Sequence, residues 1–561
     1  MSYDLKITGG TIVDGSGKPG FAGDLGIKDG KVVAVGKAEG EGLRTIDAAN
    51  RIVAPGFVDV HTHYDAQILW DRLLSISPWH GVTTTVIGNC GFGVAPTRAA
   101  HRKLILQTLE KVEGMSLDAL QAGLGEAWPF ETFPQYLDSV EKRGSAINVA
   151  ALFSHTPLRL YVMGEASTER AATADEIVAM KKLVREAMEA GAIGFGTSMA
   201  VSHNGYAGKP VPSRQATVEE MHELVSVMGE MKRGLMQITI GREFSTKAMA
   251  EVSRKYGIPV TWTALLSYMY GPGGHRKQLA LADEQRKSGA FVIPQVSCRP
   301  LNFEFTFAEP FIFDVMKFMN ELSVEDARSP GTRRRAYADP AWRRKFTAEL
   351  TPIFRRWWDR TIIAWAPSAR ELEEQPLADA AAKLGKDPVD LALDLALAND
   401  LQARFRMAVM NFDESEVAEL ITDPNTIIAL SDAGAHASQL CDACYATYLL
   451  GHWVRERGTF TIEQAVHHLT QRPAEMFGIT DRGLLAEGRP ADVVVFDPGT
   501  VGPGPLRRVY DLPAGADRLI SEANGIDAVV VNGRLIRQNG KDLVGANDKL
   551  PGRLLRHGRA A

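Results

Sequence analysis

The sequence predicts an α/β protein: a (β/α)8 TIM-like barrel with a small β-sandwich formed by the N- and C-terminal segments. Two patterns favour this fold. Both ends of the 561-residue chain read as short strands divided by turns, and the middle alternates strands with helices. Strands that alternate with helices are typical of parallel βαβ units. Barrels built from such units often exceed 250 residues as one domain.

Composition narrows the class of protein. The chain is 45% hydrophobic and 23% charged, as in ordinary globular proteins. A net charge of −5 argues against a nucleic-acid partner, which usually requires a basic excess. Four cysteines are too few for a disulfide framework and fit a reducing compartment. No signal peptide or long apolar stretch is evident, so we expect a cytoplasmic protein without a membrane segment.

Residues 1–54 and 483–561 are predicted to form the composite sandwich. The first segment has short apolar strands at 5–7, 11–13, 24–28, 31–35 and 51–54, separated by Gly9-Gly10, Asp14-Gly15 and Asp29-Gly30. Such dipeptides are hairpin-type turn signals. The tail repeats this pattern, with apolar runs at 491–496 and 528–531 before Asn532-Gly533. Two unrelated β caps are the alternative interpretation.

Residues 55–482 are predicted to form the barrel. Amphipathic helices are expected at 174–190 and 218–231. Because the reactive groups of such barrels lie at the carboxyl ends of the strands, those ends are where a site is expected. The predicted strands are 57–61, 83–88, 148–155, 192–198, 234–239, 259–265, 291–297 and 426–432.

An interval at about 299–424 interrupts the alternation and is far longer than ordinary loops. It contains helical stretches at 376–384 and 388–398, and nine Lys or Arg within 331–360. We expect an inserted cap or lid, or a contact between copies of the chain in a homo-oligomer. A solvated basic face explains the arginines equally well.

Side chains that bind metals end several predicted strands. His61 and His63 are two residues apart in the first strand, so both project to the same side, as two imidazoles on one ion require. Cys90 ends the second strand, and its thiolate could bind a soft metal or be packing. Asp432 ends the eighth strand and could bind metal and accept a proton, or cap a helix.

Several sequence runs extend these strand-end positions. They are GFVDVHTHYD (56–65), GVTT (81–84), GNCG (88–91), GAIGFGTS (191–198), PSRQA (212–216), SDAGAH (431–436) and GRPAD (488–492). Together these runs resemble the amidohydrolase superfamily, and within it the N-acyl-D-amino-acid deacylase (D-aminoacylase) branch. The resemblance spans nearly the whole chain, and it implies a TIM-like barrel, a sandwich built from both termini, and hydrolysis of amide-type C–N bonds by metal-activated water.

The resemblance also implies roles for individual residues. His61 and His63 would be metal ligands, with Cys90 as the thiolate of the centre. Asp432 would be a ligand and the general base that then protonates the leaving amine. Candidates for substrate binding, each with a structural alternative, are His155, His203, Arg242, Arg299 and His436.

The sequence departs from the branch at its second metal site. The histidines that the resemblance leads one to expect at the ends of strands five and six are absent, because no histidine occurs between His222 and His275. We therefore expect one divalent ion, zinc, rather than two, held by His61, His63 and Asp432 with Cys90 as a possible fourth ligand. Three protein ligands and an open position suffice to activate water.

The sequence thus predicts an enzyme, a metal-dependent hydrolase of N-acyl-(D-)amino acids or related acylated amines, with a small-molecule substrate. One alternative is a cyclic amide (lactam, imide or hydantoin) hydrolase of the same superfamily. A second alternative is a metal-free, non-catalytic binding scaffold.

Overall fold

The computed structural model describes residues 2–241, 243–314 and 316–560, in two compact units. The larger unit consists of Met1–Arg299 and Ser415–Ala561, and the smaller consists of Pro300–Glu414. Among the described residues, no helix combines the length and the apolar composition needed to cross a bilayer.

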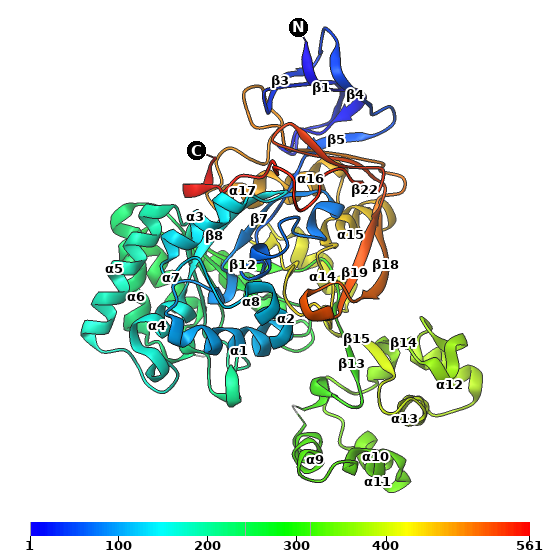
Figure 1. The fold of residues 1–561 in the computed structure, drawn as a ribbon. Coiled ribbons are helices and arrows are strands. Elements are labelled where there is room, and N and C mark those ends of the chain that lie inside the picture. Colours follow the sequence, from blue (N-terminus) through cyan, green and yellow to red (C-terminus); the bar gives the residue numbers. More distant parts are fainter. Residues whose placement is uncertain (1, 242, 315, 561) are drawn as a thin grey trace. The chain divides into compact units, whose positions relative to one another are not determined.

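Eight parallel strands form the central sheet of the larger unit (Figure 1). Their order in the sheet follows the chain, and a parallel bridge between Thr62 and Ala433 joins the segments that follow the first and last strands. The sheet fits the predicted TIM-like barrel. Its strands are β6 (Phe57–Asp59), β7 (Val82–Ile87), β8 (Asn148–Ser154), β9 (Gly194–Ser198), β10 (Met236–Thr239), β11 (Val260–Thr263), β12 (Val292–Val296) and β16 (Ile427–Ile428).

The strands form because their side chains are buried on both faces, as is usual for parallel sheets covered by helices. The predicted helices are found as α5 (Ala174–Ala190), which starts at a Thr173–Glu176 capping box, and α6 (Val218–Met231). The other helices of this unit include α1 (Arg102–Glu113), α2 (Leu117–Leu124), α3 (Phe133–Arg143), α4 (His155–Met163), α7 (Thr246–Tyr256), α8 (Gly274–Lys287), α14 (Glu414–Thr422), α15 (Tyr445–Tyr448), α16 (Ile462–Leu469) and α17 (Gln471–Met476).

Both ends of the chain contribute to one nine-stranded sheet (Figure 1). The ends meet where Val53 on β5 pairs antiparallel with Val495 on β17. The predicted hairpin turns at Asp29-Gly30 and Asn532-Gly533 are present, and positive φ at all four residues matches the type I′ turn. The strands are β1 (Tyr3–Ile12), β2 (Phe21–Lys28), β3 (Lys31–Gly36), β4 (Gly42–Asp47), β5 (Ile52–Pro55), β17 (Val493–Phe496), β20 (Ile526–Val531), β21 (Arg534–Gln538) and β22 (Lys541–Asp542).

One predicted turn is wrong. Gly9-Gly10 does not separate two strands but lies within β1, whose pairing with β2 shifts register between Ile7 and Gly10. Gly9 has φ 71°, and a Cβ on Gly10 would approach Val53 to 2.6 Å. The glycines therefore form a bulge that lets β1 pass close to β5.

The smaller unit has its own sheet and core. Strands β13 (Leu301–Thr306), β15 (Arg404–Met410) and β14 (Thr361–Trp365) are antiparallel, in that order. An aromatic cluster that includes Phe305, Phe313 and Trp357 fills the core. Several basic side chains pair with acids of this unit, as Arg343 does with Asp390 and Asp394. Its helices are α9 (Lys317–Arg328), α10 (Thr332–Ala338), α11 (Pro340–Ala348), α12 (Leu377–Leu384) and α13 (Pro388–Ala398).

A buried polar junction joins the barrel to the terminal sheet within the larger unit. Arg482 Nε lies 2.6 Å from Asp492 Oδ2, and that carboxylate also accepts from Asn148 Nδ2 at 2.7 Å. The amide of Asn532 donates to Asp492 Oδ1 at 2.7 Å. Arg482 and Asp492 are buried, whereas Asp481, which also pairs with Arg482, is partly exposed.

We expect Asp492→Asn to lower the free energy of unfolding by about 3–5 kcal/mol, because it removes the buried one of the two carboxylates that pair with the buried Arg482 guanidinium. The matched variant Asp481→Asn, at the exposed partner, should cost at most about 1 kcal/mol. Denaturant unfolding of both variants provides the measurement. Equal destabilisation by the two substitutions would contradict this account of the junction.

Candidate metal centre

The barrel topology brings four predicted side chains together. His61 and His63 follow β6, and Cys90 lies in a one-turn helix, η3 (Asn89–Gly91), that follows β7. Asp432 follows β16, at the point where the chain returns to pair with the segment that carries the histidines. Because all these strands are parallel, their carboxyl ends meet at one end of the barrel.

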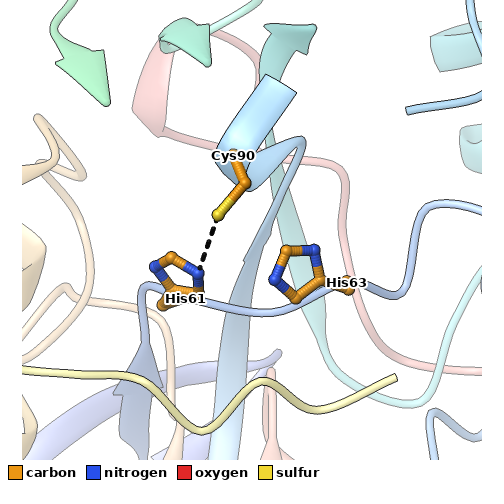
Figure 2. A group of neighbouring side chains, drawn as sticks. All are labelled: His61, His63 and Cys90. Carbon is orange, nitrogen blue, oxygen red and sulfur yellow. Dashed lines mark hydrogen bonds between the residues drawn. The ribbon is translucent and has the colours of Figure 1, made fainter. Parts of the chain in front are cut away.

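The donor atoms of the four side chains face one another. The Sγ atom of Cys90 lies 3.5 Å from Nε2 of His61, as the dashed line in Figure 2 marks. Asp432 Oδ1 lies 3.4 Å from Nε2 of His61 and 3.7 Å from Nε2 of His63. Ligand atoms of His61, His63 and Cys90 all lie within 4.8 Å of one another. The two histidines are almost completely buried, and Asp432 is 23% exposed.

These separations fit a tetrahedral ion. Zinc binds nitrogen and oxygen at about 2.0–2.1 Å and sulfur at about 2.3 Å, so tetrahedral geometry places two such ligands about 3.4–3.6 Å apart. The measured separations of 3.4, 3.5 and 3.7 Å lie close to that range. Two imidazoles, a thiol and a carboxylate are also a donor set that zinc accepts.

Acceptors on other elements orient both imidazoles toward the centre. His61 Nδ1 lies 2.6 Å from Oε1 of Gln295, on β12. His63 Nδ1 lies 3.1 Å from Oε1 of Glu113, at the end of α1. Each acceptor favours the tautomer with the proton on Nδ1, which leaves the Nε2 lone pair for a metal.

The backbone at Cys90 is fixed in an unusual conformation. Its φ of 54° lies in the left-handed region, which residues with a Cβ seldom adopt. The Cys90 amide donates to Oε1 of Gln237, on β10, at 2.6 Å. This hydrogen bond helps hold the turn that points the thiol toward His61 (Figure 2).

The electrostatics of the cluster favour ionised ligands. Burial opposes ionisation of the Cys90 thiol, but His61 and His63 outweigh it and lower its pKa to about 6. Burial also opposes ionisation of Asp432, yet the nearby His63 ring and the charges of His61 and His436 outweigh it and lower its pKa to about 2. Thiolates and carboxylates are the forms that bind metals.

Two of the other candidates, His155 and His203, are engaged with protein groups. His155 is buried, with Nδ1 2.8 Å from Thr197 Oγ1 and Nε2 2.9 Å from Glu220 Oε1, surroundings that favour a structural role. His203 lies nearer the cluster, with its ring 5.1 Å from that of Phe92 and Nδ1 2.7 Å from Ser198 Oγ. Burial lowers the pKa of His203 to about 4, so it is neutral at physiological pH.

Arg299 is buried beside Asp442, with Nε 3.2 Å from Oδ1, and its guanidinium lies over the Tyr448 ring. These contacts favour a structural role for this candidate also. His436 is partly exposed, lies four residues after Asp432, and its charge affects the pKa of that carboxylate. Arg242 lies outside the described residues.

Sequence reasoning missed Glu113, Gln237 and Gln295. The two glutamines had a signal, since each is a long polar side chain on a strand that is mostly or completely buried. No sequence signal marks Glu113, because it ends an ordinary amphipathic helix 50 residues from His63. Its role depends on how α1 packs.

A parallel barrel with metal-binding side chains at its strand ends defines a class of barrel hydrolases. The sequence profile of the amidohydrolase family matches residues 44–293 and 336–537, more than half of the chain. The chain therefore belongs to the amidohydrolase family. It is 30% identical to D-aminoacylase of Alcaligenes xylosoxydans xylosoxydans, over 96% of this chain and 95% of that protein. The family resemblance predicted from the motifs is confirmed.

Solved structures agree with this membership. N-acyl-D-glutamate deacylase from Bordetella bronchiseptica, complexed with zinc and a phosphonate mimic of the tetrahedral intermediate, is 29% identical. The TM-score is 0.65, and the structural alignment covers 99% of this chain and 100% of that one. A D-aminoacylase described as having a binuclear metal centre, with one-metal activation and second-metal attenuation, is 27% identical. The TM-score is 0.66, and the structural alignment covers 98% of this chain and 99% of that one.

We expect Glu113→Ala to weaken zinc affinity by about 10–100-fold, because the His63 ring then loses the acceptor that fixes its orientation. Competition with a fluorescent zinc chelator measures this change without relying on activity. The matched control is Glu110→Ala, on the same helix, whose carboxylate accepts from the Leu117 amide. An unchanged affinity in Glu113→Ala would contradict the orienting role.

Proposed function

We propose that this protein is a metal-dependent hydrolase that cleaves the amide bond of N-acyl-D-amino acids or related acylated amines. The observation that carries the proposal is the convergence of His61, His63, Cys90 and Asp432 at the strand ends of the barrel. Similarity to D-aminoacylase and to N-acyl-D-glutamate deacylase along nearly the whole chain supports the substrate class.

The centre holds one divalent ion, zinc, in this proposal. Nε2 of both histidines, the Cys90 thiolate and Oδ1 of Asp432 are the ligands. Neighbouring strands supply Gln237 and Thr263, whose side chains are 3.5 Å apart. Gln237 Oε1 also accepts from the Cys90 amide. An amide and a hydroxyl are neutral and weak ligands for zinc, so they favour one ion over two.

When bound, a divalent ion polarises the amide carbonyl and makes water a stronger acid. Asp432 is the only one of the four side chains with appreciable exposure, so water and substrate can reach its carboxylate. Asp432 accepts the proton of the attacking water and returns it to the leaving nitrogen. His61 and His63, held through Nδ1, keep a fixed position during this transfer.

His436 and His203 are the predicted substrate-binding residues that we retain in this role. His436 is partly exposed close to Asp432, and neutral His203 lies between Phe92 and Ser198. A neutral imidazole can donate one hydrogen bond to a carbonyl without competing with the metal for an anion.

The domain boundaries also remain a proposal. We propose that residues 1–54 and 483–561 form one two-layered β-sandwich, and that residues 55–482 form the barrel with the inserted segment. A buried cluster shared by both termini, which includes Leu25, Ile27, Val493 and Val530, supports a common core for the sandwich.

Metal analysis tests the ligand set and the number of ions. Protein purified without chelators should contain about one zinc per chain, and the double variant His61→Ala/His63→Ala should contain almost none. His452→Ala, on a distant helical segment, serves as the control. Metal-free wild-type protein would favour the scaffold alternative, and a content near two would refute the single-ion centre.

Asp432→Asn should lower kcat by about 10²–10⁴-fold, because the amide cannot accept the proton from water. The substrate is N-acetyl-D-methionine, and the control is Asp423→Asn, whose side chain caps a nearby turn. Wild-type protein should not hydrolyse N-acetyl-L-methionine or dihydrouracil at comparable rates. Preference for dihydrouracil would instead support the cyclic amide alternative.

A further inference from the structure

A cavity of about 290 Å³ lies along α1 in the larger unit, and we call it the α1 cavity. Its walls come from α1, the α4 region and the loop at residues 205–212. Side chains that line it include Phe92, Leu104, Leu109 and Val211. None of the proposed metal ligands lines it.

The inner end of the α1 cavity is close to the metal centre. Phe92 lines the cavity and follows Cys90 by two residues. Leu109 also lines it and lies four residues before Glu113, on the same face of α1. Four residues span about 6 Å along a helix. Because Glu113 contacts His63, the cavity begins about one helical turn from the centre.

The surface of the α1 cavity is mostly hydrocarbon, although Gln107 and three threonines also line it. The Thr108 hydroxyl donates to the Leu104 carbonyl at 2.8 Å, and the Thr168 hydroxyl to the Glu165 carbonyl at 3.0 Å. Thr156 donates to Ser213 at 3.2 Å. With their hydroxyls engaged, these residues offer methyl groups, and apolar cavities tend to bind apolar ligands rather than water.

The charged residues of the lining mark its outer end. Lys103, Glu165 and Lys209 are all exposed, and Lys209 pairs with Glu169 at 3.0 Å. The cavity therefore extends from the neighbourhood of Cys90 and Glu113 toward solvent. An elongated apolar group lying in the cavity would bury no charge at its inner end, where Phe92 and Leu109 form the wall.

We propose that the α1 cavity receives the aliphatic acyl chain of the substrate, so that the enzyme favours medium-length acyl groups over acetyl. This inference rests on the proposed function. A cavity of about 150 Å³ holds benzene, so one of about 290 Å³ accommodates roughly ten carbons.

Charge distribution in the substrate favours the acyl chain over the amino-acid side chain. The α-carboxylate and the side chain leave the same carbon atom, so a side chain placed in the α1 cavity would bring the carboxylate against its apolar inner end. The acyl chain leaves the scissile carbonyl in the opposite direction and keeps the carboxylate outside.

A series of N-acyl-D-methionines from acetyl to decanoyl tests the proposal. In the wild type, kcat/KM should rise about two- to fourfold for each added methylene up to about eight carbons. Thr108→Phe, which fills the cavity, should lower kcat/KM for the octanoyl substrate at least tenfold and change that for acetyl less than twofold. Thr108→Val, of nearly equal shape, should retain the rise.

Leu104→Trp is a second filling variant, at a half-buried position, should Thr108→Phe fail to fold. Isothermal titration calorimetry with decanamide provides a readout independent of turnover: wild type and Thr108→Val should bind it, and the filled variants should not. A parallel series of N-acetyl-D-amino acids with lengthening side chains separates the two sources of an aliphatic chain. A gain in that series that Thr108→Phe abolishes would overturn the acyl assignment.

The two proposals can fail separately. Hydrolysis of N-acetyl-D-methionine with no dependence on chain length and no decanamide binding would overturn the acyl cavity and leave the proposed function intact. Decanamide binding that Thr108→Phe abolishes, without hydrolysis at any chain length, would overturn the proposed function while supporting chain binding in the cavity.

Discussion

Two contacts at Nδ1, a hydrogen bond from His61 to Gln295 and an ion pair between His63 and Glu113, determine what the rest of the centre can do. Gln295 lies on a strand and Glu113 on a helix, and both are far from the His61–His63 pair in the sequence. Each contacts one imidazole and holds it with Nε2 facing Cys90 and Asp432. Without them the rings could rotate about χ2 and present either nitrogen. The barrel supplies the positions of the ligands, but these acceptors supply the orientation that a tetrahedral ion requires.

The two acceptors differ in charge, and this difference affects the two imidazoles differently. Gln295 is neutral, whereas Glu113 is a buried carboxyl group; burial opposes the charged form of His63, but Glu113, Asp432 and Cys90 outweigh it and raise the pKa of His63 well above its usual value. A carboxylate partner makes an imidazole a better electron donor to a metal than an amide partner does. The candidate centre is therefore asymmetric, with a strongly raised pKa at His63 and a direct contact between His61 and the Cys90 thiol.

The parts of the fold that could be predicted from the sequence are those encoded by local sequence patterns. The barrel strands are short buried apolar runs, and helices such as α5 begin at capping residues, so both features are encoded nearby in the chain. The antiparallel pairing of β13 with β15 was not predicted, because Leu301 pairs with Met410 across more than 100 residues. The four donor side chains could be predicted because they lie at the ends of strands. The contact of Glu113 with His63 could not be predicted, because it depends on how a helix packs.

Helix α1 links the orientation of His63 to the shape of the α1 cavity. Glu113 and Leu109 occupy one face of this helix, so a shift of α1 along its axis would move the acceptor of His63 and the wall of the α1 cavity together. A group that fills the cavity and packs against Leu109 would therefore also hold Glu113 in place. Binding energy from an acyl chain, remote from the reacting bond, would in this way be used to position the catalytic centre.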